Sequence, residues 1–328
     1  MPAPKGDFEL PEISFGAATF GGVYGGFSES DAAAVCERAL ENGINHFDTA
    51  PLYGDSQRIL GAALRQIARR WPREKYTIST KVGRYDKYDC DYSIPRIHES
   101  IANSLKLLGT DYIDIIVGHD VEFNDEDSVV AALKVLFDYK DKGTIRKVAI
   151  SGYPLGKLLR IAQRCQAENG RPLDVMFSYC QLNLHSQRLL QFAPQFREAG
   201  IKTIVNLSPL SMGLFRPQGP PDWHYASTEL RAACSNVRSL CASRGVSVAV
   251  LAGKYALHKG QTADPEGKPW ITTTVLGLSK TNEVDDAVQL LGKGKEYTDL
   301  EREVLKEVEG IMAPFHNFEW VEVLTKPE

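Results

Sequence analysis

Short apolar runs alternate along the chain with longer segments in which apolar residues recur every three or four positions. The runs have the length and continuity of strands that are buried on both faces of a parallel sheet. Between them, Ile97, Ile101, Leu105 and Leu108 illustrate the helical spacing that places apolar side chains on one face. Eight strands are predicted, at Ile13–Ala17, Ile44–Phe47, Tyr76–Ser79, Tyr112–Val117, Lys147–Ile150, Val175–Phe177, Thr203–Asn206 and Thr273–Leu276.

Turn and capping residues mark the boundaries between these elements. Ser28–Asp31 precedes the first helical segment, and Gly43 ends it just before the second strand. Ser93 and Gly109 frame another helical segment in the same way. Strands that alternate with helices indicate crossover units and a parallel sheet. Eight of each predict a closed (β/α)8 TIM barrel, with an open doubly wound sheet as the alternative.

The last third of the chain adds segments to this alternation. The loop Pro217–Tyr225, rich in Pro and Gly, follows the seventh strand. Two helical segments, Thr228–Ser243 and Val248–Leu257, then precede the eighth strand. A further helix at Asp299–Ile311 and an aromatic tail at Phe315–Trp320 end the pattern. The sequence therefore predicts a barrel with extra C-terminal helices.

Composition limits the possible functions. The 328 residues contain no linker or repeat, so we expect one barrel domain over residues 1–328. A net charge of −4 excludes a generally basic nucleic-acid binder, and no apolar run reaches the roughly 18 residues of a membrane span. The six cysteines lack zinc-site spacing, which predicts no metal site. With no secretory signal in view, we expect a monomer in the reducing cytoplasm.

Polar residues follow three neighbouring predicted strands. Asp48 and Tyr53 come after the second strand, Lys81 after the third and His119 after the fourth. Since barrel active sites lie at the carboxyl ends of the strands, these side chains should meet there. A phenol has a pKa of about 10, which a neighbouring ammonium lowers toward neutrality. We expect Lys81 to tune Tyr53, Asp48 to orient Lys81, and His119 to position a substrate oxygen. A structural ion pair beside a rim tyrosine is the alternative.

The segment Gly43–Gly54, GINHFDTAPLYG, is similar to the signature of the aldo-keto reductases. Other family positions follow in order between about Phe15 and Leu291; they are Thr80–Lys81, His119, Ser151, Gln181 and Ser208–Leu210. The resemblance implies a (β/α)8 barrel that reduces carbonyls or oxidises alcohols with a nicotinamide cofactor. It also implies that Tyr53 is the general acid/base, assisted by Asp48, Lys81 and His119.

The resemblance further implies where the cofactor binds. The positions are Thr19, Asp48, Ser151, Gln181, Ser208, Leu210, Gly213, Gly277, Ser279, Glu283 and Asp286. Two departures from the family pattern stand out. Gly152 occupies a position where many members have Asn, so one amide contact should be lost. Leu207 stands where others place an aromatic ring, so stacking on the nicotinamide should be weaker.

The turn after the eighth strand indicates which form of the cofactor binds. Members that prefer NADP hold its extra phosphate there with Lys and Arg, whereas this chain has Leu278 in place of the Lys and Glu283 at or beside the Arg position. Carboxylates at Glu283, Asp285 and Asp286 would repel that phosphate, although they also complement a helix dipole. Lys280 opposes this reading because it can pair with a phosphate. We predict NAD as the cofactor.

No GxGxxG or GxxxxGK[ST] motif is present, so Rossmann and P-loop sites lack their defining turn. The glycine-rich segment Gly21–Gly26 follows the first strand, and we expect a substrate-side loop there rather than a phosphate cradle. The expected substrate contacts are Tyr24, Tyr53, His119, Phe123, Trp223 and His224. For Trp223 and His224, packing of their own loop is the alternative.

A narrower resemblance concerns five segments, namely His119–Phe123, Ile150–Pro154, Ser178–Leu184, Leu210–Leu214 and Gly219–His224. They are similar to the branch of the family that oxidises D-arabinose or L-galactose. The resemblance implies NAD-dependent oxidation of an aldose at C1 to the aldonolactone, on the route to erythroascorbate or ascorbate. An NADPH-dependent carbonyl reductase of the same fold and a non-catalytic, nucleotide-sensing subunit are the alternatives.

Overall fold

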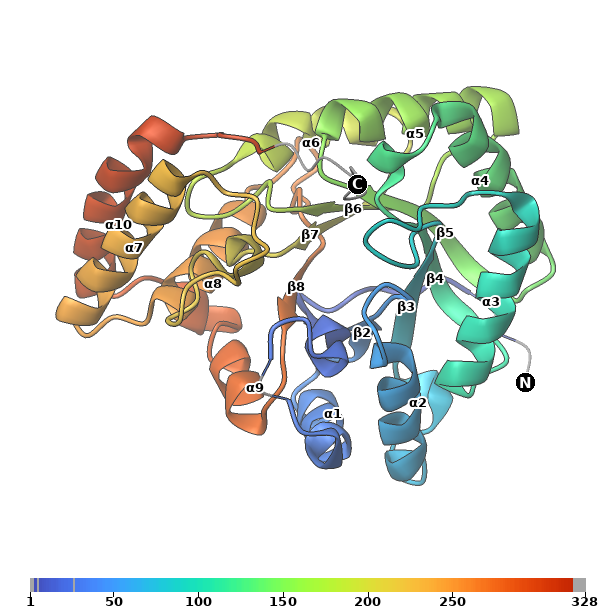
Figure 1. Cartoon of the computed structure of the whole chain (residues 1–328), viewed down its shortest axis with the longest axis horizontal. Coiled ribbons are helices and arrows are strands. Elements are labelled where there is room, and N and C mark those ends of the chain that lie inside the picture. The colour runs from blue at the N-terminus through green and yellow to red at the C-terminus, as the bar shows by residue number, and fades with distance from the viewer. Residues whose placement is uncertain (1–2, 5, 26, 321–328) are drawn as a thin grey trace.

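The computed structural model describes residues 3–4, 6–25 and 27–320 of the chain. Its strands pair in sequence order, all parallel, and β8 pairs with β1 to close a barrel (Figure 1). The predicted (β/α)8 fold class is therefore confirmed. The strands are β1 (Ile13–Gly16), β2 (His46–Asp48), β3 (Thr77–Val82), β4 (Ile113–Gly118), β5 (Ile145–Gly152), β6 (Val175–Tyr179), β7 (Thr203–Leu207) and β8 (Thr273–Gly277).

Helices surround the barrel and connect the strands. They are α1 (Ala32–Glu41), α2 (Ser56–Ile67), α3 (Ile94–Leu108), α4 (Glu126–Asp141), α5 (Leu155–Asn169), α6 (Arg188–Glu198), α7 (Thr228–Ser243), α8 (Val248–Gly260), α9 (Thr281–Val288) and α10 (Asp299–Met312). Figure 1 shows α7, α8 and α10 grouped on one side of the barrel. The predicted extra helices are thus confirmed, with α8 and α10 ending slightly later than the sequence indicated.

Each strand is buried on both faces, which explains why its sequence reads as an apolar run. On β4, Ile115 and Val117 point into the barrel, whereas Ile116 packs outward against the helices. On β6, Phe177 likewise points into the barrel, and the residues on either side of it point outward. The barrel interior is consequently a packed core, which leaves only the strand ends for a site.

The amino-terminal end of the strands, here called the bottom of the barrel, is closed by charge pairing. The buried Asp114 accepts hydrogen bonds from Arg73 Nη2 at 2.6 Å and Arg146 Nη1 at 2.7 Å. A buried carboxylate is tolerated when it is paired in this way. The Phe8 ring lies 4.3 Å below the Arg146 guanidinium, and Leu10 enters the barrel core. A site must therefore lie at the opposite end, here called the mouth.

Of the strands that extend beyond the apolar runs that predict them, β3 and β5 extend furthest. β3 continues through Lys81 to Val82, and β5 runs from Ile145 to Gly152, including Ser151. The ladder hydrogen bonds continue regardless of side-chain polarity, whereas an apolar run ends at the first polar residue. Lys81 and Ser151 consequently belong to strands and have more rigid positions than loop residues.

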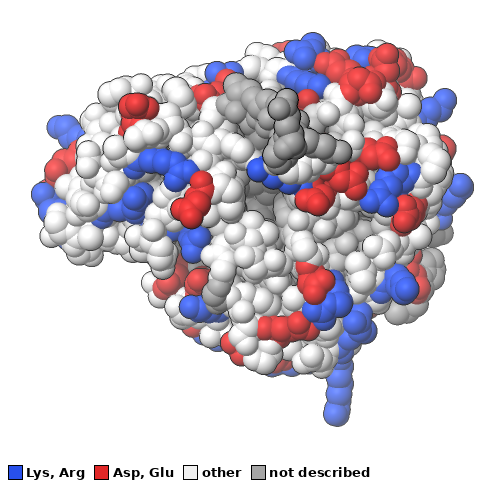
Figure 2. All heavy atoms as spheres, viewed as in Figure 1, with Lys and Arg blue, Asp and Glu red and all other residues white. Residues whose placement is uncertain are grey.

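Three further features concern the surface charge, possible metal ligands and possible membrane-spanning helices. On the face shown in Figure 2, basic and acidic side chains are interspersed. Within residues 3–4, 6–25 and 27–320, no cluster of three His, Cys, Asp or Glu could hold a metal ion. No single described helix is long and apolar enough to cross a membrane; α7 and α8 pass that test only as a pair bent by 106°.

Candidate active site

A buried ion pair lies at the mouth. The fully buried Lys81 Nζ donates hydrogen bonds to Asp48 Oδ2 at 2.7 Å and to the Thr49 carbonyl at 3.0 Å. Ser79 Oγ donates to the other oxygen of Asp48, at 2.6 Å. Both carboxylate oxygens of Asp48 are therefore occupied, which fixes the position of the ammonium.

Tyr53 and His119 complete the predicted tetrad. The Tyr53 ring centre lies 4.7 Å from Lys81 Nζ, and the His119 ring meets it edge-on at 5.7 Å. Tyr53 is half-buried at the mouth, whereas His119 is buried. The four side chains thus come together from β2, β3, β4 and the turn after β2.

The glycine-rich loop holds Tyr53 in place. A Cβ atom added at Gly21 would lie only 1.7 Å from the Tyr53 carbonyl oxygen, so only glycine fits there. Gly54 adopts a left-handed φ of 55° against the same glycine. The sequence predicts a substrate-side loop here, and the structure adds a second task, because Gly21 packs directly on the backbone of Tyr53.

The electrostatics of Tyr53 differ from expectation. Burial raises the pKa of the Tyr53 phenol well above its ordinary value, and the negative charges of Asp48 and Asp120 raise it further. The Arg84 guanidinium acts in the opposite direction. The pKa of Tyr53 is therefore raised on balance, not lowered as the sequence predicted. Burial of the phenol is the main physical reason, and the Asp48 carboxylate, 2.7 Å from the Lys81 ammonium, adds a negative charge that favours the neutral phenol.

His119 is a neutral imidazole. Burial lowers its pKa well below the ordinary value, and the positive charges of Lys81 and Arg84 lower it further. Its backbone is anchored on both sides, since Tyr92 Oη donates to the His119 carbonyl at 2.8 Å and the His119 amide donates to Val82 O at 2.8 Å. A neutral ring held this rigidly can donate one hydrogen bond to a substrate oxygen.

A second ion pair, which sequence reasoning missed, borders His119. Arg84 Nη1 donates to Asp120 Oδ2 at 2.5 Å, and both residues are buried. Asp120 has a left-handed φ of 45°, and the Phe123 ring lies 4.6 Å from the Arg84 guanidinium carbon. Both charged residues come just after strands, where the sequence gives no sign that distinguishes them from ordinary loop residues.

Glu122 explains the unusual glycine at position 152. Its Oε1 accepts hydrogen bonds from the Tyr153 amide at 2.9 Å and from Tyr179 Oη at 3.2 Å. Its Oε2 lies 2.3 Å from where a Cβ of Gly152 would be. A side chain at 152 would thus displace the carboxyl group. Burial raises the pKa of Glu122 to about 8, with Asp120 acting in the same direction.

Two mouth loops meet through aromatic residues. The rings of Tyr24, after β1, and Trp223, after β7, lie 6.0 Å apart, and 39% of Trp223 is exposed. We call this pair the aromatic wall. His224 is instead buried, with Nε2 placed 2.9 Å from Ser211 O and Nδ1 accepting from the Ala226 amide. These contacts favour the packing role for His224.

The end of the described chain also reaches the mouth. The Trp320 ring stacks on Tyr153 at 5.2 Å, and its amide donates to Tyr153 Oη at 3.2 Å. Glu319 accepts a hydrogen bond from Gln181 Nε2 at 2.8 Å and pairs with Arg188 at 3.0 Å. The sequence predicts an aromatic tail, but it does not predict where in the fold the tail packs.

The expected nicotinamide contacts lie on β5 and after β6. Ser151 Oγ donates to Gly118 O at 3.4 Å, and the Asp120 amide lies 3.3 Å from the same hydroxyl. Gln181 Nε2 donates to the Tyr153 carbonyl at 3.0 Å, in addition to its bond with the tail. Ser151 therefore lies beside the residue that follows His119, whereas Gln181 lies beside Tyr153, and both polar groups can exchange these partners for an amide.

The loop after β7 carries backbone strain. Ser208, Ser211 and Met212 have φ values of 57°, 53° and 51°, which non-glycine residues rarely adopt, and Gly213 has 103°. Strain of this kind persists where a loop must present its backbone in a fixed shape. Ser208, Leu210 and Gly213, expected to contact the cofactor, all lie in this loop, which suits a bound pyrophosphate.

At the start of α9, the hydrogen-bond donors that could bind an anion are already bonded to a side chain of this protein, that of Glu283. Glu283 Oε2 accepts from the Ser279 amide at 2.6 Å, from Ser279 Oγ at 2.9 Å and from the Lys280 amide at 3.2 Å. Helix N-termini bind phosphates through such donors. Asp285 instead pairs with Arg38 of α1 at 2.6 Å, and Asp286 is exposed. Only Glu283 of the three carboxylates contacts this site.

The neighbouring backbone also fits a nucleotide. Thr19 Oγ1 donates to the Leu278 carbonyl at 2.7 Å and joins the loop after β1 to the end of β8. A Cβ at Gly277 would lie 3.3 Å from Thr19 Cγ2, so a larger residue would crowd this junction. The donors and the small residues therefore suit an adenosine diphosphate along the mouth.

Comparison with known proteins agrees with this site. The profile of the Aldo/keto reductase family matches residues 12–309, and the chain belongs to that family. It is 36% identical to L-galactose dehydrogenase of Arabidopsis thaliana over 95% of this chain and 93% of that protein. It is 33% identical to D-arabinose 1-dehydrogenase of Saccharomyces cerevisiae over 90% and 88%, respectively.

A third relative, D-threo-aldose 1-dehydrogenase of a Pseudomonas species, is 30% identical over 48% of this chain and 55% of its own length. All three relatives are named as sugar dehydrogenases. The chain is accordingly an oxidoreductase of the aldo/keto reductase family, whose members use nicotinamide cofactors.

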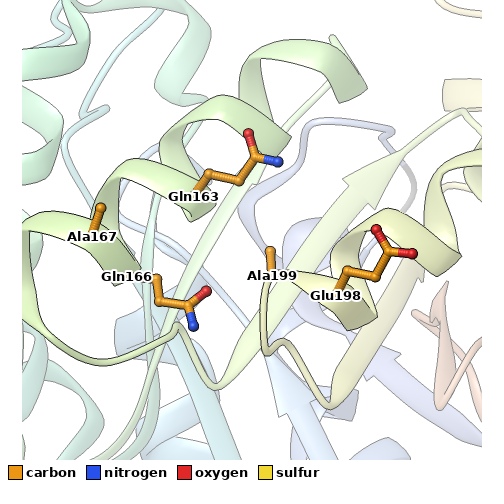
Figure 3. Close-up of a pocket in the computed structure, with 5 residues that line it drawn as sticks. All are labelled: Gln163, Gln166, Ala167, Glu198 and Ala199. Carbon is orange, nitrogen blue, oxygen red and sulfur yellow. The ribbon is translucent and has the colours of Figure 1, made fainter.

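A separate hollow lies away from the mouth, on the outer surface between α5 and α6 (Figure 3). Two glutamines, two alanines and one glutamate line it, namely Gln163, Gln166, Ala167, Glu198 and Ala199. This lining offers no acid/base pair, and we assign the hollow no part in the chemistry.

Proposed function

We propose that this protein oxidises an aldose at C1 to the aldonolactone with NAD as cofactor. The observation that carries the proposal is the meeting of Tyr53, Lys81 and the neutral His119 at the barrel mouth. The sugar dehydrogenase names of the relatives support an aldose as the substrate class. D-Arabinose and L-galactose are the first candidates, on the route to erythroascorbate or ascorbate.

The residues around the reacting carbon have different roles. Nicotinamide, when bound, supplies the hydride acceptor. Tyr53 Oη takes the proton of the C1 hydroxyl, and His119 donates a hydrogen bond to the same oxygen. Lys81 places its positive charge 4.7 Å from the Tyr53 ring, which favours the phenolate relative to a site without that charge, while Asp48 and Ser79 hold Lys81 in place. Positioning of this kind supplies much of the remaining rate enhancement.

Residues along the mouth would hold the dinucleotide. Ser151 and Gln181 would receive the nicotinamide amide, and the strained loop with Ser208, Leu210 and Gly213 would carry the pyrophosphate. The adenosine end would lie near Thr19, Gly277 and Ser279. The Tyr24–Trp223 aromatic wall and Phe123 would bound the sugar.

Preference for NAD over NADP rests on Glu283. Its carboxylate already accepts the helix N-terminal hydrogen bonds that a 2′-phosphate would otherwise receive. The doubly charged 2′-phosphate would be repelled by the negative charge of Glu283. The donors that it would need are already hydrogen-bonded to that carboxylate. A ribose hydroxyl, in contrast, can donate to the carboxylate.

The carbonyl reductase alternative has one observation in its favour. The raised pKa of Tyr53 keeps the phenol protonated near neutral pH, which suits proton donation to a carbonyl. Oxidation needs the phenolate, so its rate should climb with pH. Initial rates in both directions, each with NADH or NADPH and with NAD or NADP, separate the two functions.

The proposal is tested by following NADH absorbance with D-arabinose, L-galactose, L-fucose and D-glucose, each with NAD and NADP. We expect turnover of at least one sugar, faster with NAD. Tight cofactor binding without turnover on the whole panel would favour the nucleotide-sensing subunit instead. The proposal includes a cytoplasmic monomer, which light scattering after size-exclusion chromatography and fractionation of cells would check.

A further inference from the structure

The Arg84–Asp120 pair borders the place where the reaction occurs. Asp120 Oδ1 lies 3.7 Å from His119 Nε2, and the charges of Asp120 and Arg84 both act on the Tyr53 phenol. The pair therefore lies beside the two residues that would hold the reacting oxygen. None of the roles derived above uses it.

The local backbone is built to present this carboxylate. Asp120 has φ 45° and ψ 57°, a left-handed conformation that costs free energy in a non-glycine residue and is typical of functional positions. Its amide lies 3.3 Å from Ser151 Oγ, which ties the strained residue to β5. Arg84 is held by a β-bridge to Cys90. A loop without a functional demand would relax the strained backbone of Asp120.

The chemistry of the pair matches a hydroxyl-bearing ligand. A carboxylate accepts and a guanidinium donates hydrogen bonds, and a hydroxyl can serve both. Burial removes competing water, which strengthens such bonds but makes the pair costly unless a ligand completes it. The Phe123 ring beside the guanidinium supplies an apolar face of the kind that packs against sugar C–H groups.

We propose that Asp120 and Arg84 bind the C2 hydroxyl of the aldose and so determine substrate specificity. This inference rests on the proposed function. When O1 of the sugar is at Tyr53 and His119, the hydroxyl one carbon away falls beside the carboxylate that lies 3.7 Å from His119 Nε2. Arg84 then donates to the same hydroxyl, orients Asp120 and lowers the pKa that burial raises, which favours the carboxylate. Aldoses that lack this hydroxyl become poor substrates.

The test compares each sugar with its 2-deoxy analogue. The pairs are D-arabinose with 2-deoxy-D-ribose, and L-galactose with 2-deoxy-L-galactose, in the wild type and in Asp120→Asn. In the wild type we expect kcat/KM to fall about 10–100-fold on loss of the hydroxyl, as for a hydrogen bond to a charged group. In Asp120→Asn the parent sugar should lose a similar factor, and the deoxy sugar should change little.

Intrinsic differences in reactivity between the two sugars cancel, because the same pair is used with every variant. Arg84→Gln provides a second variant in case the first fails to fold. It should likewise reduce the ratio of kcat/KM for the parent sugar to kcat/KM for its 2-deoxy analogue. Asp174→Asn removes a different paired carboxylate, one that contacts Lys140 at 2.6 Å at the bottom of the barrel. It should leave the ratio of the two sugars unchanged.

A pH profile gives an independent readout. Tyr53 faces the charges of Asp48, Lys81, Asp120 and Arg84. Removing the negative charge of Asp120 should lower the pKa of Tyr53, so the pH at which oxidation reaches half its maximum moves down. Removing the positive charge of Arg84 should move it up. A shift without any change in the sugar ratio would give the pair an electrostatic role only and overturn the assignment.

The outcomes separate this inference from the proposed function. If the wild type oxidises the parent sugars but the variants reduce parent and deoxy sugars equally, the hydroxyl assignment is wrong and the dehydrogenase proposal stands. If the wild type oxidises none of the sugars, the proposed function fails and the assignment fails with it.

Discussion

Tyr53, the proposed acid/base, has neighbours that supply different things. Lys81 gives a charge 4.7 Å from the ring centre, whereas Gly21 gives only space against the Tyr53 carbonyl. The tetrad residues were predictable from the sequence because each follows an apolar run. Gly21 and Asp120 were not, since close backbone approach and left-handed geometry leave no residue type that marks them in one sequence.

Tyr53→Phe tests the acid/base role. It removes one hydroxyl without changing the ring, so we expect kcat to fall about 10²–10⁴-fold, the contribution usual for such a group. NAD binding, measured by calorimetry, should stay close to that of the wild type. Tyr139→Phe, on α4 and in contact with His98, is the matched control and should retain full turnover. Near-normal rates in Tyr53→Phe would remove this residue from the mechanism.

Gly21→Ala tests whether backbone contact positions the tyrosine. The added methyl group would lie 1.7 Å from the Tyr53 carbonyl oxygen, so the turn must shift. A shift of about 1 Å can lower kcat on the order of 100-fold. Gly310→Ala in α10 meets no atom within 4 Å and should be neutral or stabilising. Steady-state kinetics and thermal melts check both variants, and equal kinetics would show that Tyr53 does not depend on this contact.

At the scale of elements, strand existence was easier to predict than strand extent. All eight apolar runs became strands, yet β3 and β5 continue through Lys81 and Ser151 because backbone pairing ignores side-chain polarity. The destination of the C-terminal tail could not be predicted, because the contact between Glu319 and Gln181 spans more than a hundred residues of chain. Periodicity carries no information on contacts of that range.

The start of α9 should decide the cofactor. Glu283→Arg removes the carboxylate from Ser279 and adds a cation, so we expect kcat/KM with NADP to rise at least about tenfold relative to NAD. Asp286→Arg adds the same charge at an exposed position that does not contact those donors. It should produce a much smaller change. Equal changes in both variants would mean that long-range charge, not occupancy of the helix terminus, sets the preference.

The connection of Glu122 to the start of α5 should make stability depend on pH. Burial raises its pKa from 4.5 to about 8, so between these values the unfolded chain ionises while the folded chain keeps its proton. The free energy of unfolding should therefore fall as pH rises through this window, by at most about 1.4 kcal/mol per pH unit, and level off above it. Glu122→Gln should flatten the slope of urea midpoints between about pH 5 and 8. The exposed Glu74→Gln is the control, and unchanged slopes in both would contradict the assignment.

At the scale of the whole molecule, the two ends of the barrel carry different tasks. The bottom is closed by the Asp114 ion pairs and by Phe8, which serve stability. The mouth holds the strained backbone, the buried charges and the loops that a catalyst needs. The sequence predicted this division through the (β/α)8 pattern, because strands that all run one way place their carboxyl ends together.

The placement of Leu10 and Trp320 at opposite ends of the barrel has a practical consequence for anyone who produces this enzyme. Leu10 is inserted into the barrel at the bottom, whereas Trp320 stacks on Tyr153 beside Gln181 at the mouth. A purification handle that follows Trp320 in the chain would start from the mouth of the barrel. An amino-terminal handle, attached at the far end of the barrel, is the safer choice for kinetic work and for crystals soaked with ligand.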